Sequence, residues 1–200
     1  MSYTIITSER SPFGRICRMF MAAHKIDFEL RILNIVDSKQ DADALSLETP
    51  INKIPILVID GDQKIFDSRV IINYLVKKYN LPPLTLDQEN YVSVVYSCLD
   101  VSVILFLMKQ SGYDLEAQNL YITRQKERIP ANLEFLKSWM ISLNPENLTD
   151  WNYASMSLYS FLYWAKMRAR SVDFEKYPHF ETFLEKFAHA PGVNESGFKN

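Results

Sequence analysis

The stretch that decides the fold is NKIPILVIDGDQKIFDSRVIINYL, residues 52–75. Within it, two short apolar runs, Ile56–Ile59 and Lys64–Phe66, flank the polar residues 60–63, which include a glycine. Two such runs around a short glycine-containing turn predict a β-hairpin. Pro55 has no backbone N–H, so it can stand only at the first residue of the first strand or at a sheet edge. The stretch therefore predicts an antiparallel strand pair that begins just after a proline.

Predicted helices and strands alternate before and after this hairpin. Ser68 begins a helical pattern directly after it, because the apolar residues recur at helical spacing. Upstream, the pattern predicts a strand over Tyr3–Thr7, a helix over Pro12–Lys25, a strand over Phe28–Leu33 and a weaker helix over Ser38–Leu47. Two strands joined through a helix are expected to be parallel, whereas the two hairpin strands must be antiparallel. Residues 1–79 are thus expected to form a small α/β domain.

The predicted secondary structure changes after this domain. Consecutive prolines at Pro82 and Pro83 indicate a linker, which we place at residues 80–87. No further strand is expected, and residues 88–200 are predicted to form an all-α helical domain. Its helices are expected over Tyr91–Met108, Ala117–Met140, Asp150–Arg170 and Tyr177–Ala188, with Pro130 starting or kinking the second.

Composition excludes several classes of function. The chain has 200 residues, a net charge of -2 and a hydrophobic content of 48%, which is ordinary for a globular protein and shows no basic footprint for nucleic acid. Polar residues interrupt the apolar run Val92–Met108, so we interpret it as a buried helix and expect no membrane span. The N-terminus has no export signal, and Cys17 and Cys98 lie in no metal-ligand spacing, so a cytoplasmic protein with free thiols and no metal is expected.

Two predicted helix starts and one proline are the candidate features of a ligand-binding site. Ser11-Pro12 and Asp67-Ser68 each precede a helix, and helix capping alone explains both pairs. Capping does not explain Ile54-Pro55, an X-Pro bond at which a cis peptide is a rare and specific alternative to trans. A cis bond there would turn the Ile54 backbone groups outward, so that they can pair with an extended peptide-like ligand. All three features would meet at one end of the sheet, where two helix N-termini favour an anionic ligand.

These segments resemble a known family. A strand, a four-residue turn into a helix, and a later Ile-Pro before a hairpin is the thioredoxin-like layout. Where glutaredoxins have Cys-Pro-aromatic-Cys, this chain has Ser11-Pro12-Phe13-Gly14 and so lacks both redox sulfurs. With an all-helical domain after it, the chain looks like a cytosolic glutathione transferase of the serine type. The resemblance rests on SPFGRICRMFMAAHKI, on the opening stretch, and on LTDWNYASMSLYSFLYWAKMR and YPHFETFLEKFAHAP, which fit later helices of bacterial members.

The resemblance implies roles for particular residues in binding glutathione, the co-substrate. Ser11 would donate its hydroxyl proton to the glutathione sulfur and stabilise the thiolate, and Ile54, followed by the cis residue Pro55, would pair with the cysteinyl backbone. Asp67 would bind the γ-glutamyl ammonium, Ser68 the γ-glutamyl carboxylate and Lys53 the glycine carboxylate. The family more often has Glu or Gln at the position of Asp67, so a shorter or water-bridged contact is expected there.

The second substrate would be a small hydrophobic electrophile. The resemblance places its pocket between the edge of the glutathione site and the first helix of the helical domain, with Phe13, Tyr96, Val103, Phe106 and Leu107 as the lining. It also implies a homodimer. The electrophile and the reaction subtype (conjugation, isomerisation, dehalogenation or peroxide reduction) stay open.

Three alternatives also stay open. Ser8 lies close to Ser11 in sequence and would face the thiol instead. A non-catalytic, transferase-like scaffold or regulatory binding protein would have the same fold without glutathione chemistry. A disulfide reductase is disfavoured, because no cysteine stands at Ser11 or Gly14.

Overall fold

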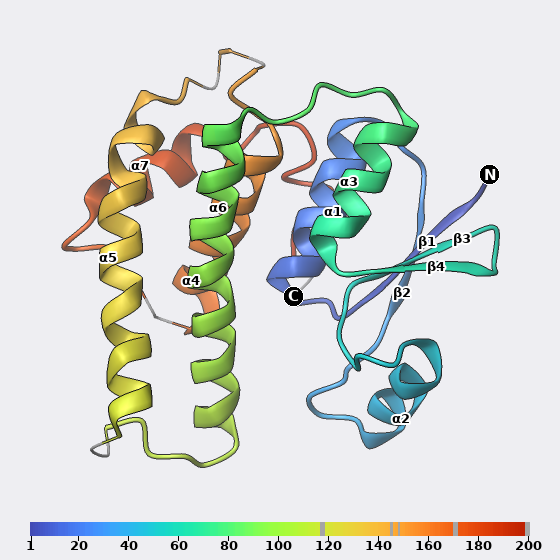
Figure 1. Cartoon of the computed structure of the whole chain (residues 1–200), viewed down its shortest axis with the longest axis horizontal. Helices are drawn as coiled ribbons and strands as arrows, with labels where there is room; N and C mark the ends of the chain where they lie inside the picture. The colour runs from blue at the N-terminus through green and yellow to red at the C-terminus, as the bar shows by residue number, and fades with distance from the viewer. Residues whose placement is uncertain (117–118, 145, 148, 170–171, 199–200) are drawn as a thin grey trace. The chain divides into compact units, whose positions relative to one another are not determined.

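A computed structural model describes the chain except for residues 117–118, 145, 148, 170–171 and 199–200. The chain divides into two compact units (Figure 1). The sheet unit comprises residues 1–83 together with the C-terminal segment, residues 189–198, and the helical unit comprises Leu84–Ala188. The sequence analysis assigned the C-terminal segment to the helical domain, whereas in the structure it groups with the sheet unit.

The sheet has four strands in the order β2-β1-β3-β4. They are β1 (Tyr3–Thr7), β2 (Glu29–Ile32), β3 (Ile56–Ile59) and β4 (Gln63–Phe66). β1 and β2 are parallel and β3 and β4 are antiparallel, as predicted, and β1 and β3 pair antiparallel in the centre. Every residue of β3 is buried, because the strand is paired on both edges and helices cover both faces of the sheet.

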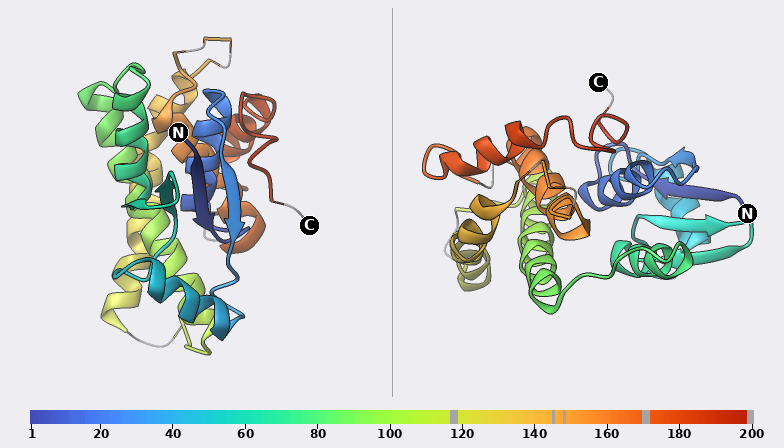
Figure 2. Two further views of the ribbon diagram at one scale, coloured as in Figure 1. Left: turned by 90° about the vertical axis from the view of Figure 1, so that its right-hand side faces the viewer. Right: turned by 90° about the horizontal axis from the view of Figure 1, so that it is seen from above.

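Helices cover both faces of the sheet, namely α1 (Pro12–Ala23), α2 (Lys39–Glu48) and α3 (Ser68–Lys78). Leu45 of α2 packs into a buried cluster with Ile6 of β1 and Ile56 of β3. Side chains alternate between the faces of a sheet, so Ile5 and Leu57 point to the opposite face. There α1 and α3 pack against each other and against the strands (Figures 1 and 2).

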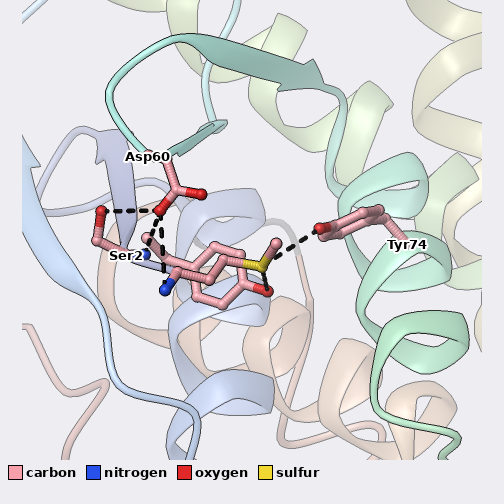
Figure 3. Close-up of polar contacts among 5 residues, drawn as sticks. Ser2, Asp60 and Tyr74 are labelled. Atoms are coloured by element: carbon pink, nitrogen blue, oxygen red, sulfur yellow. Dashed lines mark hydrogen bonds and ion pairs between the residues drawn. The ribbon is translucent and has the colours of Figure 1, made fainter.

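The turn of the predicted hairpin is tied to the start of β1 (Figure 3). The Ser2 backbone N–H donates to the Asp60 carboxylate at 2.6 Å, and the Asp60 N–H donates back to the Ser2 carbonyl at 3.0 Å. Three residues, 60–62, separate the paired Ile59 and Gln63, and Asp60 and Gly61 among them have φ values of 50° and 78°, in the left-handed region that tight hairpin turns use. Tyr74 of α3 also reaches this region, and its hydroxyl donates to the Met1 sulfur at 3.9 Å. These contacts fix the end of the sheet away from the candidate site.

The helical unit contains α4 (Leu86–Gln110), α5 (Leu120–Ser142), α6 (Tyr153–Trp164), a π-helix η1 (Ala165–Ala169) and α7 (Pro178–Lys186). α4 and α5 lie side by side and antiparallel (Figure 2). Pro130 lies inside α5, so no helix starts there. The predicted limits Ala117 and Arg170 fall outside the described residues. α4 starts before the predicted Tyr91, because Thr85 and Gln88 form a reciprocal capping box.

By length and composition alone, α4 is apolar enough to cross a membrane. It packs against α5 and α6, and 44% of its most apolar window is buried inside the protein. A core helix of a globular protein has the same properties, so these features are weak evidence for a membrane span.

Candidate functional site

The register of the sheet brings three of the predicted segments to one end. Ile6 of β1 pairs with Ile56 of β3, and Ile56 pairs with Phe66 of β4. The chain therefore leaves β1, enters β3 and leaves β4 at the same end of the sheet. The starts of α1 and α3 and the Ile54–Pro55 bond all lie there, where the sequence analysis expected them together.

Ser11 is the N-cap of α1. Its Oγ accepts a hydrogen bond from the Gly14 N–H at 3.1 Å, and its side chain is buried, with 8% of the residue exposed. Its carbonyl accepts the first helical bond from the Arg15 N–H at 2.9 Å. The capping bond uses a lone pair of the hydroxyl oxygen, so the hydroxyl proton can still be donated to a ligand. Capping and thiol contact are therefore compatible roles for this side chain.

Gly14 allows α1 to lie directly against the end of β1. A Cβ at this position would lie 1.9 Å from the Thr7 Oγ1. Thr7 is fully buried, and its Oγ1 donates to the Ser8 carbonyl at 3.4 Å. Where glutaredoxins carry their second cysteine, this chain therefore has a residue that packing restricts to glycine.

Ser8 lies in the turn between β1 and α1. Its carbonyl accepts from the Ser11 N–H at 3.2 Å, so the two serines are linked through the backbone. Ser8 is half-buried and lies outside the helix, whereas Ser11 is the N-cap of α1. Of these two serines, Ser11 is the one whose hydroxyl lies at the positive end of a helix dipole.

Arg18 is a residue of this site that sequence reasoning missed. Its side chain is buried, and its Nη2 donates to the Glu9 carbonyl at 3.0 Å, while Nη1 lies 3.9 Å from the Glu9 carboxylate. Burial lowers the pKa of this guanidinium, and the Glu9 carboxylate opposes the shift. Arg18 thus fastens α1 to the turn that leads to Ser11. The available signal was a basic residue within an otherwise apolar helical run.

The segment before β3 has its backbone at the same end of the sheet. The Ile54–Pro55 peptide bond is cis. Pro55 is buried, and Ile54 is half-buried and packs against the cluster that includes Ile6 and Leu45. Lys53 next to it is exposed. The side chain of Ile54 therefore anchors the segment while Lys53 extends into solvent.

Asp67 and Ser68 form the start of α3. Asp67 is the N-cap, and its Oδ1 accepts from the Arg69 N–H at 2.8 Å. Its φ of 71° is rare for a residue with a side chain, and such conformations cluster at ligand sites. Ser68 follows at the first helical position and is buried. One carboxylate oxygen of the exposed Asp67 side chain thus caps the helix, and Oδ2 is the oxygen available to a ligand.

Cys17 does not supply the nucleophile. It is fully buried, and burial raises the pKa of its thiol strongly, an effect to which the nearby Asp67 carboxylate adds. A buried thiol of this kind stays protonated at neutral pH and is unreactive. Among the described residues, no group of three or more His, Cys, Asp or Glu side chains could hold a metal ion.

The residues predicted to line the second-substrate pocket belong to two elements. Phe13 is half-buried in the first turn of α1. The other four lie on α4, where Val103 and Phe106 are half-buried and Leu107 is 40% exposed. Tyr96 is buried inside the helical unit, and its hydroxyl accepts from the Tyr153 hydroxyl at 2.8 Å. Tyr96 thus has a structural partner of its own, and the pocket stays a prediction.

Phe106 also has neighbours within the helical unit. Its ring meets the Trp164 ring edge to face, with 5.5 Å between centroids, and the Arg168 guanidinium lies 5.3 Å from the Phe106 ring centroid. Arg168 belongs to the π-helix η1, and single turns of π-helix are frequent at functional sites.

Sequence comparison relates the N-terminal part of the chain to one family. The profile of the family described as "Glutathione S-transferase, N-terminal domain" matches residues 5–83. Human glutathione S-transferase theta-1 is 33% identical over 75 residues, which covers 38% of this chain and 31% of the human protein. The chain therefore spans less than a third of the length of that relative.

Structural comparison extends over the whole chain. A glutathione transferase family member from Pseudomonas fluorescens, solved with bound glutathione, has a TM-score of 0.82 at 18% identity, with 100% of both chains covered. A glutathione S-transferase from Methylobacterium radiotolerans, solved with glutathione sulfonate, has a TM-score of 0.78 at 19% identity, covering 98% of this chain and 94% of the other. Residues 5–83 therefore match the N-terminal domain of glutathione S-transferases in sequence, and the chain as a whole has the fold of the glutathione S-transferase structures.

Proposed function

We propose that this protein is a glutathione transferase of the serine type, in which Ser11 stabilises the thiolate of bound glutathione for attack on a small hydrophobic electrophile. The observation that carries the proposal is the position of Ser11, whose hydroxyl oxygen caps α1 through the Gly14 N–H and leaves its proton available for a ligand sulfur. The nucleophile belongs to the ligand, and the protein orients and ionises it.

The energetics of this arrangement are sufficient. Lowering the pKa of a thiol by about 2 units requires about 2.7 kcal/mol of preference for the thiolate. One hydrogen bond from a hydroxyl to a charged acceptor contributes about 1.5–3 kcal/mol, and the positive end of a helix adds about 0.3–1 kcal/mol. A serine at the start of α1 therefore activates a thiol without a separate general base.

The protein has groups at the same end of the sheet that would bind the other parts of glutathione. Ile54 would pair through its backbone with the cysteinyl part, in the manner of an added strand. The Asp67 carboxylate would bind the γ-glutamyl ammonium through Oδ2, since Oδ1 caps α3. Ser68 would bind the γ-glutamyl carboxylate, since the first backbone N–H groups of a helix have no partner within it. Lys53, which is exposed, would bind the glycine carboxylate.

The remaining parts of the proposal rest on the family. The electrophile would bind beside Phe13 and the α4 residues named above, the active form would be a homodimer, and the protein would act in the cytoplasm, in keeping with a role in detoxification. The chain boundary between the two domains is proposed within residues 80–87.

Turnover of Ser11→Ala tests the proposal. With glutathione and chlorodinitrobenzene, a small apolar electrophile, we expect at least a tenfold loss of turnover, about the effect of one lost charge-assisted hydrogen bond, with glutathione binding largely retained. Because Ser11 is also a helix cap, the variant loses about 0.5–2 kcal/mol of stability as well.

Two control variants separate these effects. Ser38→Ala removes the equivalent cap of α2, where Ser38 Oγ accepts from the Asp41 N–H at 3.2 Å, and should reduce stability without reducing turnover. Ser8→Ala should turn over like the wild type. Full activity of Ser11→Ala, or a loss confined to Ser8→Ala, would contradict the assignment of Ser11. Wild-type protein that neither binds nor uses glutathione would favour a non-catalytic scaffold.

A further inference from the structure

The C-terminal segment touches the backbone of α1. At Gly192, an added Cβ would lie 2.2 Å from the Met19 carbonyl oxygen and 3.0 Å from the Ala23 nitrogen. Gly192 has a φ of 84°, so both the space and the backbone conformation require glycine here. Val193 and Ser196 beside it are buried. The segment is therefore a packed part of the sheet unit and not a loose tail.

Arg15 connects this segment to the first turn of α1. Its side chain is fully buried, its Nη2 donates to the Val193 carbonyl at 3.4 Å, and its guanidinium lies 5.1 Å from the centroid of the Phe198 ring. Burying a cation is costly, and nearby carbonyl oxygens and aromatic faces offset part of that cost; the C-terminal segment supplies one of each. The backbone N–H of the same residue donates to the Ser11 carbonyl at 2.9 Å. Arg15 thus closes the helical turn behind Ser11 and also holds the segment.

We propose that the C-terminal segment is a strap that fixes the first turn of α1, and that Arg15 is the positioning residue through which the strap acts on Ser11. This inference rests on the proposed role of Ser11 in stabilising a thiolate. The Ser11 hydroxyl must point at the ligand sulfur within a narrow range of distance and angle, because small displacements remove most of the benefit of a positioned group. A strap attached one turn further along the helix restricts that displacement.

Two glycines with the same φ value give a matched test. Gly192→Ala introduces a clash with α1, whereas Gly112→Ala, also at a φ of 84°, meets nothing within 4 Å. We expect Gly192→Ala to lower kcat about tenfold with a small change in the KM for glutathione, and to move the pH profile of kcat to higher pH. Gly112→Ala should leave both unchanged.

The same change in a Ser11→Ala background distinguishes positioning from a general structural role. If the strap acts through Ser11, adding Gly192→Ala to Ser11→Ala costs no further activity, because coupled residues are not additive. An equal loss of activity in both backgrounds would overturn the proposal. So would an unchanged pH profile in the single variant.

A readout that needs no catalysis separates failure of the strap from failure of the proposed function. Hydrogen exchange of the Arg15 amide, which donates to Ser11, should be faster in Gly192→Ala than in Gly112→Ala. Unchanged exchange would overturn the strap even in an active enzyme. Faster exchange in a protein without glutathione turnover would support the strap and refute the proposed function.

A milder pair of variants covers the case in which Gly192→Ala fails to fold. Phe198→Leu removes the ring beside the Arg15 guanidinium, and Phe198→Tyr keeps it. The first should accelerate exchange of the Arg15 amide and lower kcat, and the second should restore both. If both variants behave like the wild type, the strap does not act through Arg15.

Discussion

At the scale of single residues, the candidate site is built by close packing at the end of β1. Gly14 lies so near Thr7 that any side chain would collide with it, and Ser11 caps the helix that this contact positions. The hydroxyl of Ser11 therefore has a fixed place because glycine stands three residues further on. A buried threonine and a glycine, neither of which contacts a ligand in our proposal, determine where the reactive group lies.

Replacement of Gly14 tests this packing. Gly14→Ala would place a Cβ 1.9 Å from the Thr7 Oγ1, so α1 or β1 must shift. We expect a loss of about 1–3 kcal/mol in the free energy of unfolding, measured by urea denaturation. Adding Thr7→Ala should recover part of that loss, because it removes the colliding oxygen. No loss in the single variant would show that the helix start is not restricted by Thr7.

The residues that begin the helices and the hairpin of the sheet unit were largely predictable from sequence, because their signals are local. Ser11 before a proline and Asp67 before a helix are recognisable helix starts, and Pro55 before an apolar run is recognisable as the start of a strand. Arg15 and Arg18 were not predictable in the same way. Their partners lie in the C-terminal segment and in the preceding turn, and no spacing in the sequence encodes those contacts.

At the scale of elements, α2 is held to the sheet by one buried apolar side chain and by ion pairs to both edge strands. Leu45 is its only buried residue among those described, whereas Glu48 at its C-terminus lies 2.5 Å from Arg31 of β2 and 2.7 Å from Lys64 of β4. β2 and β4 are the two edge strands. A single carboxylate therefore links α2 to both edges of the sheet and adds to the anchoring that Leu45 provides.

The pH dependence of stability tests this link. Hydrogen bonds from Lys64 and Arg31 hold the pKa of Glu48 below its ordinary value of 4.5. A carboxyl whose pKa is lower in the folded state stabilises the fold above its unfolded pKa and loses that contribution as the pH falls through the folded value. Since the side chain is partly exposed, we expect about 1 kcal/mol at most.

Urea denaturation of Glu48→Gln should therefore show lower stability than the wild type at neutral pH, with the difference shrinking below pH ~4.5. Glu29→Gln on β2 serves as the control, because Glu29 has no ion pair among the described residues. A difference between Glu48→Gln and the wild type that stays constant down to low pH would contradict an electrostatic origin.

Element boundaries in the helical unit were less predictable than their order. α4 begins at Leu86, which is 78% exposed, so apolar periodicity gave no sign of its first turn. The capping box of Thr85 and Gln88 was the signal that marks it. Pro130 was predicted to start or kink a helix, and its position within α5 excludes the helix start.

At the scale of the whole molecule, the chain forms a sheet unit and a helical unit, and its C-terminal segment returns to the first of them. The division into two parts was predictable, because the pattern changes from alternating strands and helices to helices alone, and two prolines lie between the two patterns. The return was not predictable, because packing of Gly192 against Met19 joins residues far apart in sequence. The comparisons differ between the two parts in the same way. The sequence match to the glutathione S-transferase N-terminal domain covers residues 5–83, whereas the rest of the chain matches solved structures in fold alone.

The central claim is that Ser11 ionises bound glutathione, and a glutathione titration tests it most directly. Thermal unfolding and the ultraviolet absorbance of the thiolate would be followed in the wild type and in Ser11→Ala. Ligand at a hundred times its dissociation constant adds about 2.7 kcal/mol to stability, which is easily measured. We predict stabilisation of both proteins, with a thiolate signal near neutral pH in the wild type alone. A thiolate signal of equal size in Ser11→Ala, or no stabilisation of the wild type at millimolar glutathione, would contradict this account.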